Sequence, residues 1–132
     1  MTEQPPLRAG AAVSEAALSR IFTGVVARTL PKAEWTHQAH LAYGCALIDA
    51  LGLARAENAV RGHISAYNEA CGVVNDDAGG YHHTLSIFYL RAIAAQPRGP
   101  GEPCAAFAAR VLASPLADAA YPLRFYSRER LF

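Results

Sequence analysis

The apolar side chains of this chain recur with the period of an α-helix. Leu18, Ile21, Phe22, Val25 and Val26 follow the i, i+3, i+4, i+7, i+8 spacing that places side chains on one helical face. Alanine, the residue with the highest helix propensity, occurs 28 times among the 132 residues. Strict alternation of apolar and polar residues, which is typical of strands, is scarce. The spacing therefore predicts an all-α protein.

Capping residues, glycines and prolines divide the chain into five expected helices. The first helix is expected at about 14–28, and the second runs from the cap Thr36 to Gly52. The other three are expected at about 54–71, 81–96 and 103–113, and a further turn at 116–120. Because short connections make consecutive helices antiparallel, we expect an up-down helical bundle of four main helices plus a short C-terminal fifth helix. The prediction is one helical domain over 1–132, with a loose lead-in at 1–12 and an aromatic and basic tail at 121–132.

The helical phase also predicts which side chains are buried. In the second helix, one stripe of side chains faces the core, comprising His37, His40, Leu41, Gly44, Leu47, Ile48 and Leu51. Apolar residues surround most of the 81–96 segment, so we expect it to be the central helix. The predicted core residues of these two segments are Leu47, Ile48, Leu85, Tyr89 and Ile93.

Composition excludes several classes of protein. A hydrophobic content of 52% with a net charge of +1 is unlike a disordered chain, and it gives no strongly basic face for nucleic acid. No apolar run is long enough to span a membrane. Cys45, Cys71 and Cys104 are odd in number and lack metal-binding spacing, so we expect reduced thiols. With no signal-peptide pattern at the N-terminus, these features predict a cytoplasmic protein.

Four of the five histidines lie at the starts of two helices that run the same way in such a bundle. His37 and His40 begin the second helix, and His82 and His83 begin the fourth. Helix N-termini carry positive potential, which favours neutral imidazole and attracts anions. We expect His37, His40 and His82 to line one polar pocket, whereas His83 serves packing and His63 is structural.

Several segments of the chain resemble a family of small uncharacterised bacterial helical proteins. The resemblance covers about 30–132 and rests on Glu34-Trp-Thr-His-Gln-Ala-His-Leu41, Tyr67-Asn-Glu69, Gly80-Tyr-His-His-Thr84 and Tyr126-Ser-Arg-Glu-Arg-Leu131. It implies a helical fold and a common grouping of Trp35, His37, His40, Tyr67, Asn68, Tyr81, His82 and Thr84. The family pattern has glutamate where His83 stands here. The resemblance implies no activity.

Three functions fit these residues. The first is an enzyme acting on a small molecule, in which His37, His40 and His82 are acid–base groups or the ligands of one zinc, iron or manganese ion, with Glu34, Asp76 or Asp77 completing the metal shell. In either form, further residues would contact the ligand: Trp35, Tyr67, Asn68, Tyr81, Thr84 and Arg128. The second is a module that binds a small anion. The third is a scaffold or regulatory protein. Exposed apolar residues could then form the contact between two copies in a homodimer.

Overall fold

The computed structural model describes residues 4–10, 12–73, 75 and 81–124. In these ranges the chain forms five α-helices, three 3-10 helices and no strand. The α-helices are α1 (Glu15–Val26), α2 (His37–Leu51), α3 (Leu53–Ala70), α4 (His83–Ala94) and α5 (Cys104–Leu112). The 3-10 helices are η1 (Lys32–Glu34), η2 (Pro115–Ala117) and η3 (Tyr121–Arg124). The predicted all-α class is confirmed.

The helix ends follow from local chemistry. The Ser14 hydroxyl accepts from the Ala17 N–H at 3.0 Å, and the Thr36 hydroxyl accepts from the Ala39 N–H at 3.2 Å. Gly52 has a φ of +79°, which ends α2 and lets α3 begin at the next residue. The fourth helix begins at His83 rather than at 81, since His82 is its N-cap.

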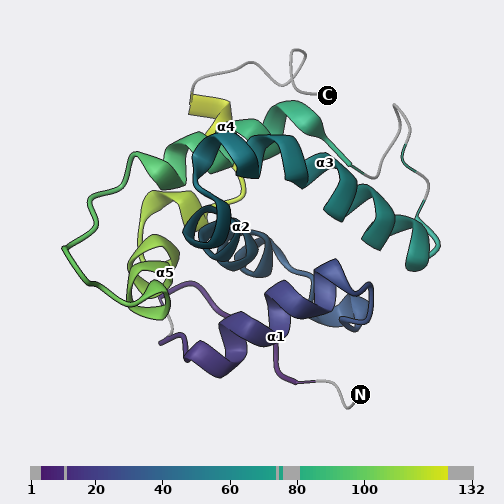
Figure 1. Ribbon diagram of the computed structural model, residues 1–132, viewed down its shortest axis with the longest axis horizontal. Helices are drawn as coiled ribbons and strands as arrows, with labels where there is room; N and C mark the ends of the chain where they lie inside the picture. Colours follow the sequence, from purple (N-terminus) through teal and green to yellow (C-terminus); the bar gives the residue numbers. More distant parts are fainter. Residues whose placement is uncertain (1–3, 11, 74, 76–80, 125–132) are drawn as a thin grey trace.

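The central helix is α2, not the predicted 81–96 segment. It contacts α1, α3, α4 and α5, and Figure 1 shows it nearly end-on, with α1 on one side and α3 and α4 on the other. Small residues make this position possible: a Cβ on Gly44 would lie 2.9 Å from the Ile93 Cδ1 atom. α4 buries only Leu90 and Ile93, because much of its inner face borders a cavity instead of packed side chains.

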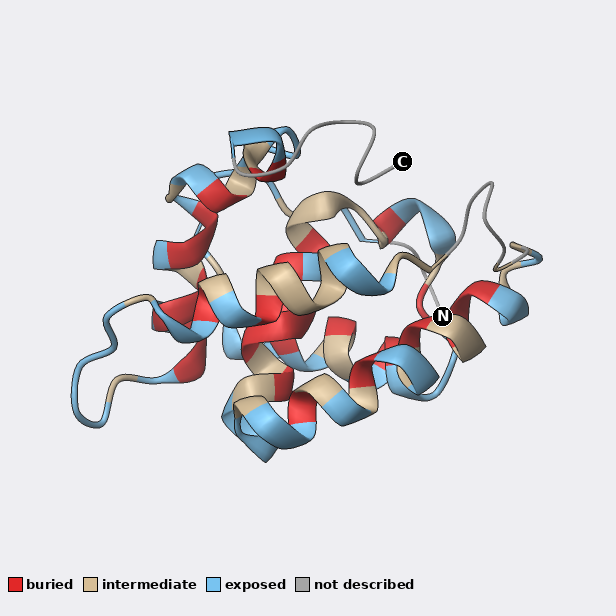
Figure 2. Ribbon diagram, turned by 90° about the horizontal axis from the view of Figure 1, so that it is seen from above, coloured by how far each residue is buried: buried red, intermediate tan, exposed pale blue. Residues whose placement is uncertain are grey.

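Burial corrects the predicted core in detail. Leu47 and Ile93 are buried as expected, whereas Ile48, Leu85 and Tyr89 are only half-buried. Leu51 is 38% exposed although the stripe predicted it inside. The buried residues lie mainly where the helices face one another, and the exposed residues lie mainly on their outer sides (Figure 2).

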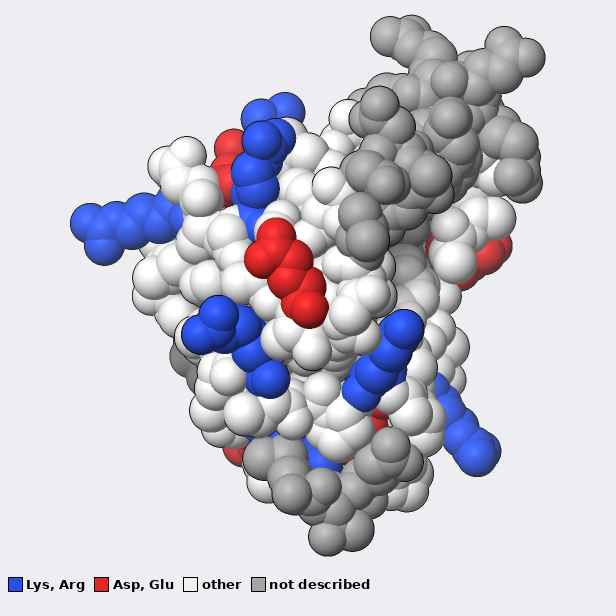
Figure 3. Space-filling model, turned by 90° about the vertical axis from the view of Figure 1, so that its right-hand side faces the viewer, with Lys and Arg blue, Asp and Glu red and all other residues white. Residues whose placement is uncertain are grey.

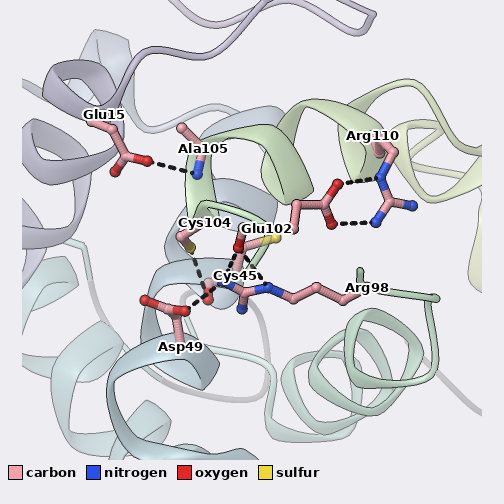
Figure 4. Close-up of polar contacts among 8 residues, drawn as sticks. All are labelled: Glu15, Cys45, Asp49, Arg98, Glu102, Cys104, Ala105 and Arg110. Atoms are coloured by element: carbon pink, nitrogen blue, oxygen red, sulfur yellow. Dashed lines mark hydrogen bonds and ion pairs between the residues drawn. The ribbon is translucent and has the colours of Figure 1, made fainter. Parts of the chain in front are cut away.

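A group of ion pairs and hydrogen bonds surrounds the start of α5 (Figure 4). Arg98 pairs with Asp49 at 2.8 Å, and Arg110 pairs with Glu102 at 2.6 Å. A carboxylate oxygen of Glu15 accepts from the Ala105 N–H at 3.2 Å, at the start of α5. The ion pairs join the 97–103 connection to α2 and α5, and the Glu15 hydrogen bond joins α1 to the first turn of α5.

Two described residues of the N-terminal lead-in have hydrogen bonds to the rest of the protein. The Gly10 N–H donates to the Leu112 carbonyl at 2.8 Å, and the Gln4 N–H donates to Glu34 at 3.1 Å. At the other end, the turn predicted at 116–120 is η2, and the described part of the tail is η3. No described helix has the length and apolarity needed to cross a membrane.

Candidate functional site

A cavity of about 540 Å³ opens between η1, α2, α3 and α4. The sequence predicted nine site residues, and the structure brings seven of them together in its wall: Trp35, His37, His40, Tyr67, Asn68, Tyr81 and His82. The rest of the wall is mostly apolar, with Leu41, Val60, Ile64, Leu85, Leu90 and Ile93. Among the described residues, no aspartate or glutamate lines it. Catalytic or binding roles for the seven stay predictions.

His40 is an exposed residue whose ring lines the cavity. Its Nδ1 atom is 2.7 Å from the Thr36 carbonyl oxygen, which only accepts, so Nδ1 carries the proton of the neutral ring. Desolvation lowers the pKa of His40 to about 4, outweighing the Thr36 carbonyl, which raises it. His40 is therefore neutral near pH 7, with the lone pair of its other nitrogen on Nε2.

His37 is held by the segment that follows α5. Its Nε2 atom lies 2.9 Å from the Leu116 carbonyl oxygen, to which it donates, and its ring meets Tyr89 edge-on with centroids 5.2 Å apart. The neighbouring Gln38 amide donates to the Ala117 carbonyl at 3.2 Å. The segment after α5 therefore lies against the start of α2 and holds the His37 ring in place.

His82 caps α4 with its own side chain. Its Nδ1 atom accepts from the Leu85 N–H at 3.3 Å. The Thr36 hydroxyl has the same role at the start of α2. Because both helix starts have a side-chain acceptor, they have less capacity to attract an external anion than the sequence suggested.

Aromatic rings form much of the remaining wall. The Trp35 indole stacks on His40 with centroids 3.7 Å apart and meets Tyr67 and Tyr43 edge-on at 5.4 and 5.9 Å. The Tyr67 hydroxyl donates to the Leu30 carbonyl at 2.8 Å, inside the protein. Burial raises the pKa of Tyr67 above its usual value, so the hydroxyl keeps its proton.

An asparagine pair closes one side of the cavity. The buried Asn68 amide donates to the Asn75 side-chain oxygen at 3.1 Å, and that oxygen also accepts from the Tyr81 N–H at 2.9 Å. The Asn75 amide donates to the Ser65 carbonyl at 3.0 Å. Asn68 and Asn75 therefore attach Tyr81, which precedes α4, to α3.

Two predicted site residues are not in this wall. Thr84 is exposed and borders a separate open groove with His83 and Phe88. Arg128 lies outside the described residues, as do Asp76 and Asp77.

Three other polar residues have contacts away from the cavity. Glu34 is buried against Arg20, which holds it with two bonds of 2.7 and 2.8 Å; this pairing lowers the pKa of Glu34. His63 Nδ1 lies 2.7 Å from the Tyr43 hydroxyl, consistent with its predicted structural role. His83 is exposed, with Nδ1 2.7 Å from the Tyr81 hydroxyl, so its predicted packing role is wrong.

A three-histidine metal site finds no support in the geometry. In the part of the chain that the structure describes, no three His, Cys, Asp or Glu side chains are grouped so that they could hold one metal ion. His37 and His82 instead have nitrogens engaged with Leu116 and Leu85. The zinc, iron or manganese expectation is therefore left without a ligand set among the described residues.

Two features of the wall escaped the sequence. Tyr43 is buried, with 2% exposure, and lies three residues after His40, a spacing that places both on one helical face. The Tyr89 hydroxyl is buried and has no hydrogen-bond partner within the described structure. Sequence alone gives no signal for such an atom, because its partners would come from other elements.

The surface shows no concentration of one charge on the face in Figure 3. Basic and acidic side chains stand singly among uncharged residues there.

Comparison of the chain with protein-family models, curated proteins and solved structures gave no match.

Proposed function

We propose that this protein binds a small, largely apolar organic molecule in the cavity between α2, α3 and α4. The observation that carries the proposal is a cavity of about 540 Å³ with an aromatic and aliphatic wall and two imidazoles from the start of α2. Ligand pockets commonly have volumes of about 300–1,000 Å³ and combine apolar walls with a few polar groups. An anion is the weaker alternative, since both helix starts are capped and the only lysine, Lys32, is exposed.

The single tryptophan offers a direct measurement of binding. Trp35 lies in the wall, so a molecule that enters the cavity changes the environment of its indole. We expect aliphatic alcohols and small cyclic hydrocarbons to shift the Trp35 emission and to raise the melting temperature. Sodium phosphate and sodium acetate at the same concentration are expected to do neither.

Two matched variants locate the response. Leu85→Phe adds volume at the cavity wall and should weaken the response, whereas Ile87→Phe alters a half-buried residue of α4 outside that wall and should leave it unchanged. Equal responses from both variants, or no response to any compound in the wild type, would contradict the proposal.

An acid–base enzyme is the second candidate, favoured by the fixed tautomer of His40. Its Nε2 lone pair could take a proton from a bound molecule, as a general base does. The test is turnover of any compound found to bind, measured in the wild type and in His40→Phe. Turnover that is equal in both proteins would exclude His40 as the base.

We also propose a cytoplasmic location and a homodimer. Cys45, Cys71 and Cys104 are free thiols, which suits a reducing compartment. The apolar side chains of Val26 and Leu51, which are 45% and 38% exposed, could contribute to contact between two copies. Cell fractionation and size-exclusion chromatography with light scattering test these two proposals.

A further inference from the structure

Four polar side chains of the cavity wall have hydrogen bonds within the protein. The Tyr67 hydroxyl donates to the Leu30 carbonyl, and the His37 Nε2–H donates to the Leu116 carbonyl. The Tyr43 hydroxyl is 2.7 Å from His63 Nδ1, and the Asn68 amide donates to Asn75. These four polar groups, which would otherwise be available to a ligand, are engaged within the fold.

His40 differs because it keeps an acceptor. Its Nδ1–H donates to the Thr36 carbonyl within its own helix, so the Nε2 edge of the ring is directed away from that backbone. The stack with Trp35 at 3.7 Å fixes the plane of the ring. His40 is exposed to the cavity, and no described residue is bonded to its Nε2 atom.

The charge of the wall further narrows the ligand. No described carboxylate lines the cavity, so an organic cation would meet no counter-ion among the described residues. A carboxylate placed against His40 would face the lone pair of its Nε2 atom instead of a donor. Lys32, the one cationic residue of the wall, is exposed to solvent and lies on η1. A neutral molecule is therefore favoured over either ion.

We propose that the ligand is a neutral aromatic molecule with a hydroxyl or N–H group that donates a hydrogen bond to His40 Nε2. This proposal rests on the proposed function and adds the chemical class of the ligand. The aromatic part suits a wall that contains Trp35, Tyr67 and Tyr89, since ring pairs add stabilisation beyond the burial of area. His40 then acts as a specificity-determining residue, because it distinguishes a donor from a molecule of similar shape without one.

The experiment compares four probes that share one ring system: β-naphthol, β-methoxynaphthalene, naphthalene and β-naphthoate. Binding to the full chain is measured by titration calorimetry near neutral pH. We expect β-naphthol to bind about tenfold more tightly than β-methoxynaphthalene, the difference that one net hydrogen bond of typical strength supplies. β-Naphthoate should bind more weakly than β-naphthol.

Two variants assign the preference to one imidazole. His40→Phe keeps a ring that can stack on Trp35 but removes the acceptor, so β-naphthol and β-methoxynaphthalene should bind about equally. His83→Phe is the matched control, since it replaces an exposed imidazole outside the wall, and it should keep the preference. Nitrogen NMR of the histidine-labelled wild type adds a measurement that needs no variant: the Nε2 resonance of His40 should shift with β-naphthol and not with naphthalene.

The outcomes separate the two proposals. If none of the four probes binds, the cavity is not the ligand site of the proposed function, and the inference falls with it. If naphthalene and β-methoxynaphthalene bind as tightly as β-naphthol, the cavity is a ligand site but the inference is wrong. Tighter binding of β-naphthoate, or a preference that persists in His40→Phe, also overturns the inference.

Discussion

The imidazole of His40 lies on the indole of Trp35, with ring centroids 3.7 Å apart and planes 28° from parallel. Trp35 directly follows η1, and His40 lies in the first turns of α2, so the stack joins the two sides of the turn that begins α2. The ion pair between the half-buried Arg20 and the buried Glu34 joins α1 to the adjoining η1. The position of His40 therefore depends on the turn as well as on its own helix.

The first prediction concerns the pH dependence of stability. His40 has a folded pKa near 4, below the ordinary value of 6.5, so the unfolded chain binds its proton more readily. Stability from this residue is present above pH 6.5 and is lost as the pH falls toward 4. His40→Phe should therefore lose less stability than the wild type between about pH 7 and pH 5, measured by urea denaturation. The same loss in both proteins would show that His40 titrates normally in the fold.

The second prediction compares two leucines. Leu47 is fully buried on α2, and Leu47→Ala should cost about 2–5 kcal/mol of unfolding free energy, the usual range for core truncation. Leu85 is half-buried and borders the cavity, so Leu85→Ala removes fewer contacts and should cost clearly less. Chemical denaturation of both variants provides the measurement. A larger loss for Leu85→Ala would mean that the cavity is filled by side chains in solution.

The third prediction compares two tyrosine hydroxyls. Tyr67→Phe leaves the Leu30 carbonyl without its donor inside the protein and should cost about 1–3 kcal/mol. Tyr89→Phe removes a buried hydroxyl that has no partner in the described structure, so it should be neutral or stabilising. Thermal and urea denaturation of the two variants measure the difference. If Tyr89→Phe costs as much as Tyr67→Phe, its hydroxyl has a partner in solution.

The fourth prediction concerns metal ions. Because no described group of side chains could hold one, zinc, iron(II) and manganese salts should leave the melting temperature of untagged protein unchanged, as should EDTA. The control is His37→Ala, which should respond no differently from the wild type. A rise in melting temperature with one metal that disappears in His37→Ala would re-establish the metal-dependent enzyme as a hypothesis.

Local sequence signals determined the helices of this protein and the side of the bundle that holds its histidines. Ser14, Thr36 and Gly52 act on neighbouring backbone groups, so their effect on helix ends is readable from the sequence. The parallel starts of the second and fourth helices follow from short connections, and they bring His37, His40 and His82 into one wall.

Tertiary structure alone decided which helix is central and what each imidazole does. Apolar residues around most of its circumference predicted α4 as the central helix. Burial, however, depends on which elements pack against a helix. The small residues of α2 let neighbouring helices approach it closely. The donors and acceptors of the histidines come from the backbones of Leu116, Thr36 and Leu85. Leu116 lies 79 residues from His37 in the chain, and no local pattern records such a contact. His40 Nδ1 is engaged by the Thr36 carbonyl, and no described residue is bonded to its Nε2 atom.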